Sequence, residues 1–140
     1  MNILIADDDP VTLKLLASRL CAWGHTVHQA VDGNTAWETI GGTPVDMVIS
    51  DWMMPGMDGL ELCRRIRELH ESGYIYLILI SAQDSSADIV RGLESGVDDY
   101  ITKPIDMDAL RARVEIGARI VNLERSLNHK IEIITANHIQ

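Results

Sequence analysis

Short apolar segments alternate along the chain with longer segments that are apolar on one side. Continuous apolar runs predict strands buried on both faces of a sheet, and they lie at residues 3–6, 45–49 and 74–80, with weaker runs at 25–30 and 97–101. The intervening segments carry leucine and isoleucine at helical spacing, as at Leu13, Leu16 and Leu20. Strand and helix therefore alternate five times, which is typical of a doubly wound α/β fold with a parallel sheet.

The last predicted helix is longer than a five-stranded sheet needs. It begins near Asp106 and should pack on the sheet through Leu110 and Val114. A second apolar stripe continues at helical spacing through Ile116, Ile120, Leu123, Leu127, Ile131 and Ile134. We expect this stripe to form a dimer coiled coil or a linker toward an output domain, with a frayed tail as the alternative because chain termini are often disordered.

Length and composition favour one compact domain. The chain has 140 residues, of which 46% are hydrophobic, enough for a core without crosslinks. The formal net charge of −9 argues against binding to nucleic acid or to anionic membranes, because both attract basic patches. The first apolar run is too short for a signal peptide or a membrane span, so a cytoplasmic protein is expected. Cys21 and Cys63 form no metal-binding pattern and are predicted to be reduced core thiols.

Polar residues with related chemistry follow four of the predicted strands. They are Asp7 and Asp8 after the first strand, Asp51 after the third, Ser81 after the fourth and Lys103 after the fifth. In doubly wound sheets ligands bind beyond the carboxyl ends of the strands, so we expect these side chains to meet there. Converging carboxylates repel one another and call for a hard cation such as Mg²⁺, while Lys103 and Ser81 can hold phosphoryl oxygens. The pattern predicts phosphoryl transfer to a carboxylate.

Each of these residues also has an ordinary structural interpretation. Asp9, and less readily its two neighbours, can cap the helix that starts at Pro10. Asp51 can open a turn, Ser81 can cap the fourth helix and Lys103 can be a solvated loop charge. The functional interpretation is favoured because all of them arrive at the same edge of one sheet.

About residues 1–125 resemble the receiver domains of two-component response regulators. The matching stretches are ILIADDDP, DMVISDWMMPGMDGLELCRRIR, LILISAQD and GLESGVDDYITKP. The resemblance implies a flavodoxin-like (βα)5 fold with strand order 2-1-3-4-5, and residues 126–140 are then a helical extension or linker. The segment RARVEIGARIVNLERSL is similar to the receiver exit of regulators with a cyclic-dinucleotide-synthesising output domain, which indicates an excised receiver or a short stand-alone regulator.

The resemblance also implies a role for each site residue. Asp51 is then the phosphoacceptor, Lys103 contacts the phosphoryl group, and Ser81 and Tyr100 form the conformational switch. The implied Mg²⁺ ligands are Asp7, Asp8, Asp51 and the Met53 backbone carbonyl. Met53 and Gln83 occupy positions that influence how water reaches the aspartyl phosphate, and Lys103–Pro104 matches a cis peptide bond.

The implied function is a phosphoacceptor switch that takes a phosphoryl group from a sensor histidine kinase or a histidine phosphotransfer protein. Such a receiver is not a dedicated enzyme, although it catalyses its own phosphoryl transfer and dephosphorylation. The main alternative is an aspartate-nucleophile phosphohydrolase of the haloacid dehalogenase type, in which Asp7 is the nucleophile of a DxDxV motif. It leaves Asp51 unexplained. A flavin-binding protein is a further alternative, but the three carboxylates after the first strand would repel the flavin phosphate.

Overall fold

The computed structural model describes residues 1–69 and 73–139, with side chains to residue 134. The strands are β1 (Asn2–Ala6), β2 (Thr26–Ala30), β3 (Met47–Asp51), β4 (Tyr76–Ser81) and β5 (Asp99–Thr102). The helices are α1 (Pro10–Ala22), α2 (Gly33–Gly42), α3 (Gly59–Arg67), α4 (Ser86–Glu94) and α5 (Met107–Ile139). The predicted alternation of strand and helix is confirmed.

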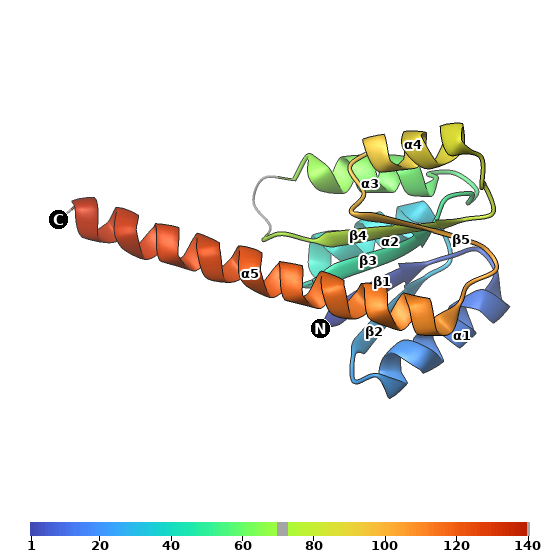
Figure 1. Cartoon of the computed structure of the whole chain (residues 1–140), viewed down its shortest axis with the longest axis horizontal. Helices are drawn as coiled ribbons and strands as arrows, with labels where there is room; N and C mark the ends of the chain where they lie inside the picture. Colours follow the sequence, from blue (N-terminus) through green and yellow to red (C-terminus); the bar gives the residue numbers. More distant parts are fainter. Residues whose placement is uncertain (70–72, 140) are drawn as a thin grey trace.

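All five strands lie in one parallel sheet in the order β2-β1-β3-β4-β5, as predicted (Figure 1). The chain order reverses between β1 and β3, so the connections that follow these two strands lead to helices on opposite faces of the sheet, and ligands of such folds bind at this position. Residues at the ends of β1 and β3 are therefore the ones that the fold places at a binding position.

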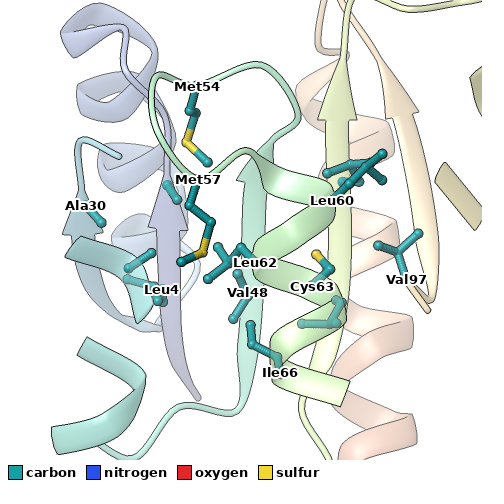
Figure 2. Close-up of a cluster of buried hydrophobic side chains, with 14 of the residues drawn as sticks. Leu4, Ala30, Val48, Met54, Met57, Leu60, Leu62, Cys63, Ile66 and Val97 are labelled. Carbon is teal, nitrogen blue, oxygen red and sulfur yellow. The ribbon is translucent and has the colours of Figure 1, made fainter. Parts of the chain in front are cut away.

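Two hydrophobic layers cover the sheet. Helices α2, α3 and α4 lie on one face, and α1 and α5 lie on the other (Figure 1). Alternate residues of β3 serve the two layers, because Val48 packs toward α3 while Met47 and Ile49 pack toward α1 and α5. Figure 2 shows the α3 layer, where Leu62 and Ile66 point from the helix onto the sheet. Burial on both faces explains why the strands are continuous apolar runs.

The prediction that both cysteines are core thiols is half right. Cys63 is buried on the sheet side of α3, and burial raises the pKa of its thiol to about 12. Cys21 is exposed, so the prediction was wrong there. Leu16 and Leu20 occupy the sheet side of α1, which turns Cys21 toward solvent.

Helix α5 is 33 residues long and begins directly after Asp106, close to its predicted start. Leu110 and Val114 are buried against the sheet, as expected, and Val121 is the next buried apolar residue along this side. Farther along, Nη2 of Arg125 lies 2.6 Å from Oδ1 of Asp46, which precedes β3. Beyond this ion pair the helix projects away from the sheet (Figure 1).

Helix α4 is loosely packed. Gly92 is the one buried residue along its fully described length, and Val90 and Leu93 are exposed. Elements with few buried contacts open and shift most easily. None of the helices in the described ranges has the length and apolar character that crossing a membrane requires.

Candidate functional site

Asp7 and Asp51 come from the two strands between which the chain order reverses. Asp51 is the last residue of β3, and Asp7 directly follows β1, where its backbone N–H donates to the carbonyl of Ala30 at 3.1 Å. The Asp7 side chain is held in turn, because its Oδ1 accepts a hydrogen bond of 2.9 Å from the backbone N–H of Asp9. Both carboxyl groups are buried, with 2% of Asp7 and 7% of Asp51 exposed.

The strand end that carries Asp51 is fixed by the start of α3. The backbone N–H of Trp52 donates to the carbonyl of Ile80 at 2.9 Å, and the N–H of Gly59 donates to the Trp52 carbonyl at 2.8 Å. A Cβ atom on Gly59 would lie 2.2 Å from the backbone oxygen of Asp51. Only a glycine allows this approach, so Gly59 is part of what holds Asp51 in place.

Asp8 completes an acidic cluster with these two residues. One carboxylate oxygen from each of Asp7, Asp8 and Asp51 lies within 4.8 Å of the other two. Burial raises the pKa of Asp51, and the charge of Asp7 raises it further. The pKa of Asp7 is also raised, mainly by burial and then by the charges of Asp8 and Asp9. Ionising these groups together is unfavourable unless positive charge is near.

Lys103 brings a positive charge and Ser81 a hydroxyl group to the edge of the sheet where the three carboxylates lie. The Nζ atom of Lys103 lies 3.3 Å from Oδ2 of Asp51 and 3.8 Å from Oδ2 of Asp7. The backbone N–H of Lys103 donates to the carbonyl of Ser81 at 2.8 Å, which ties β5 to β4 beside the site. Ser81 is fully buried, and its Oγ accepts a 3.0 Å hydrogen bond from the N–H of Gln83. The Lys103–Pro104 bond is cis, as the resemblance to receiver domains implied.

Tyr100 lies next to this group with its ring turned inward. Its hydroxyl donates to the backbone carbonyl of Gln83 at 2.6 Å. The ring meets Trp52 edge to face, with centroids 6.1 Å apart, and the guanidinium of Arg91 lies over the Trp52 ring at 5.5 Å. A Cβ atom on Gly92 would lie 2.6 Å from the tyrosine ring, so α4 contacts it directly.

The structure also separates the capping residues from the site. Asp9 caps α1, since it accepts a hydrogen bond of 3.1 Å from the N–H of Val11. Ser85 caps α4, so the alternative that Ser81 does so was wrong. Met53 follows Asp51 by two residues and its side chain is exposed, while the role predicted for its carbonyl stays a prediction.

A family model for the response regulator receiver domain matches residues 3–115. The chain belongs to this family. The receiver is 37% identical over 119 residues to the transcriptional regulatory protein TcrA of Mycobacterium tuberculosis, a match that covers 85% of this chain and 46% of TcrA. It is 41% identical over 113 residues to the response regulator PleD of Caulobacter vibrioides, covering 81% of this chain and 25% of PleD. The chain therefore spans less than half the length of both relatives.

Solved structures agree with the family. The receiver domain of the Francisella response regulator 1452 is 35% identical to this receiver and matches it with a TM-score of 0.78, covering 84% of this chain and 96% of that one. A probable two-component response regulator with a GGDEF domain matches with a TM-score of 0.81 at 26% identity, covering 87% of this chain and 50% of that one. The family match gives no support to the hydrolase or the flavin-binding alternative.

Three contributors to the receiver's site were missed by sequence reasoning. Gly59 and Gly92 are needed because another segment approaches them closely, and Arg91 lies over Trp52 from a different helix. The glycine that follows Asp58 at the start of α3 was the one available signal, because glycine is uncommon inside helices. Gly92 and Arg91 carry no comparable signal, since their partners lie in other elements.

Proposed function

We propose that this receiver is the phosphoacceptor switch of a two-component phosphorelay, with Asp51 as the residue that takes the phosphoryl group. The observation that carries the proposal is the cluster of Asp7, Asp8 and Asp51 with the Lys103 ammonium 3.3 Å from Asp51, at the switch point of the sheet. The receiver would be a signalling protein that catalyses its own phosphoryl transfer and dephosphorylation.

The acidic cluster fits a Mg²⁺ ion. Carboxylate oxygens are the ligands that Mg²⁺ prefers, and here one oxygen from each of three carboxylates lies within 4.8 Å of the others, with the Lys103 ammonium 3.3 Å from Asp51. Asp7, Asp8, Asp51 and the backbone carbonyl of Met53 would hold the ion. When bound, Mg²⁺ would neutralise charge on the transferring phosphoryl group.

The residues of the chain then have distinct tasks. An oxygen of the ionised Asp51 side chain attacks the phosphorus of a phosphohistidine, and the O–P bond forms as the bond from phosphorus to the imidazole nitrogen breaks. The imidazole nitrogen keeps the electron pair of the broken bond. The Lys103 ammonium, already beside Asp51, would pair with the phosphoryl oxygens.

A sensor histidine kinase or a histidine phosphotransfer protein is the proposed donor. The membership of the chain in the response-regulator family supports this class of partner. Helix α1 starts beside the acidic cluster and exposes Val11 and Leu15, which together form a small apolar surface next to the site. Such a surface suits contact with a donor helix.

Ser81 and Tyr100 are the proposed switch. A phosphoryl group on Asp51 adds acceptor oxygens that can draw the Ser81 hydroxyl toward them and away from the Gln83 N–H. The inward position of Tyr100 is compatible with the active side of such an equilibrium, and the loosely packed α4 is the element that can respond.

The first test is phosphorylation by a small donor. With Mg²⁺ and acetyl phosphate, intact mass should rise by one phosphoryl group, and the fluorescence of Trp52, next to Asp51, should change. Trp23 and Trp37 should first be replaced with phenylalanine so that Trp52 alone reports. No added mass under any donor would contradict the proposal.

Magnesium should stabilise the receiver, and more strongly at pH 7 than at pH 4. Burial raises the pKa of Asp7 and Asp51, so their contribution to stability is present while they are protonated and is lost as the pH rises through the raised pKa. Mg²⁺ binds the ionised forms and reverses that loss, by about 2.7 kcal/mol at 100 times its Kd. Thermal unfolding with Mg²⁺ or EDTA at both pH values measures the effect.

The matched variants for this experiment carry the same change of charge. Asp8→Asn should lose most of the Mg²⁺ stabilisation, whereas Glu38→Gln, on the exposed side of α2, should keep it. Equal stabilisation of both variants would place the ion elsewhere.

Gly92→Ala should shift Tyr100 outward. The new methyl group would lie about 2.6 Å from the ring carbon Cε2 in its present position, a separation that forces the ring to move. Fluorotyrosine-labelled protein should show a displaced Tyr100 resonance, assigned with Tyr100→Phe. Gly42→Ala, where a Cβ meets no atom within 4 Å in the described part of the chain, is the control and should leave that resonance unchanged.

A further inference from the structure

Helix α5 carries an apolar stripe that the receiver itself does not cover. Leu123 is 69% exposed and Leu127 is 55% exposed, and Ile116, Ile131 and Ile134 are exposed as well. The stripe continues onto the part of the helix that projects from the sheet beyond Arg125 (Figure 1). A projecting single helix with a solvated apolar side is marginally stable, so a partner that covers the stripe is expected.

The stripe follows a heptad pattern. When Ile120, Leu127 and Ile134 take the a positions, Ile116 and Leu123 take the d positions. Lys130 falls on the third d position, where its aliphatic stem can lie along the seam while its ammonium reaches water. This spacing is the one with which two helices pack side by side.

Ile120 is half-buried against the core that α5 shares with the sheet, and the rest of the heptad stripe lies apart from the side of α5 that packs on the sheet. The buried residues Leu110, Val114 and Val121 lie about 120° around the helix from the stripe, at about 100° per residue. A second helix can therefore cover the stripe without displacing α5 from its own sheet. We propose that residues 116–134 form a parallel two-stranded coiled coil with a second copy of this chain.

Charge at the edges of the stripe favours a second copy in parallel orientation. Arg119 takes a g position and Glu124 takes the following e position. In a parallel pair each g side chain faces the e side chain of the next heptad on the partner, so Arg119 of each copy meets Glu124 of the other. Both pairs are attractive, and the twofold symmetry forms them twice. An antiparallel pair would not bring these two residues together.

The oligomeric state of the chain tests whether the stripe forms a dimer. Sedimentation at increasing concentration, without any phosphate donor, should show a reversible dimer. Leu127→Asp should weaken dimerisation by roughly 100-fold or more, because two leucines leave the seam of each dimer. Asn122→Asp adds the same charge on the exposed side away from the stripe and should leave the dimer intact. Circular dichroism should show that both variants keep the fold.

A charge exchange tests the parallel orientation. Arg119→Glu and Glu124→Arg should each weaken the homodimer, because each sets like charges opposite one another. Mixing these two variants should give a heterodimer that is tighter than either homodimer, and combining both changes in one chain should restore homodimerisation.

Three results would overturn the proposal. A monomer at all concentrations would mean that the stripe is not a dimer interface and that a different partner, such as an output domain, covers it. A dimer that is indifferent to Leu127→Asp would place the interface on another surface. Failure of the charge exchange would exclude the parallel register. Because no step involves phosphate, these outcomes are independent of the role of Asp51.

Discussion

Asp51→Asn should abolish phosphorylation of this receiver. The amide removes the nucleophilic oxygen and one of the three clustered carboxylates, while side-chain size stays the same. With Mg²⁺ and acetyl phosphate, the variant should gain no phosphoryl mass where the wild-type chain gains one. Its thermal stability should be equal or higher, because burial and the charge of Asp7 raise the pKa of Asp51 and make its ionised form unfavourable in the fold.

Asp7→Asn is the matched control for this substitution. Asp7 is as buried as Asp51 and belongs to the same cluster, so both variants change the local charge equally. We expect Asp7→Asn to be labelled more slowly but on Asp51, as peptide mapping would show. The reverse outcome, with labelling that survives loss of Asp51 but requires Asp7, would instead support an Asp7 nucleophile.

Gly59→Ala should both destabilise the receiver and slow its phosphorylation. The added methyl group would sit about 2.2 Å from the backbone oxygen of Asp51, and a Cδ1 atom of Leu79 lies 2.9 Å away on the same side. Relief requires the start of α3 to move away from β3, with a loss of about 1–3 kcal/mol in the free energy of unfolding. Chemical denaturation measures that loss, and the rate of mass gain reports the displacement of Asp51.

Gly41→Ala is the control that shows how replacing a helical glycine affects stability where no close contact is present. A Cβ on Gly41 meets no atom within 4 Å in the described residues, and alanine favours a helix over glycine by up to about 1 kcal/mol. Gly41→Ala should therefore be neutral or stabilising. If Gly59→Ala behaved in the same way, the approach of α3 to Asp51 would not be a structural requirement.

The fold could be predicted from sequence because its strands are buried on both faces. Burial on both faces requires continuous apolar runs in segments such as residues 45–49. The segments between these runs carry apolar residues at helical spacing. The starts of β3, β4 and β5 were less accurate, since apolar residues also precede these strands: the predicted runs start at residues 45, 74 and 97, and the strands start at Met47, Tyr76 and Asp99. Apolar spacing says where burial occurs, not where hydrogen bonding between strands begins.

The site could be predicted in part for a related reason. Asp7, Asp51 and Ser81 sit at or next to strand ends, so a correct reading of the strands brings them together without knowledge of side-chain positions. Gly92 and Arg91 could not be found in this way. Their importance comes from contacts with Tyr100 and Trp52, and contacts across elements leave no local pattern in the sequence.

The ion pair between Arg125 and Asp46 connects the projecting part of α5 to the sheet. It joins the helix to the loop before β3, at the end of the sheet opposite Asp51, and the helix continues beyond it as an arm. From Arg125 to Ile139 this arm extends about 21 Å at about 1.5 Å per residue. A tilt of about 10° at the ion pair would therefore displace the end of the helix by roughly 4 Å, so a small change of angle near β3 is amplified along the helix.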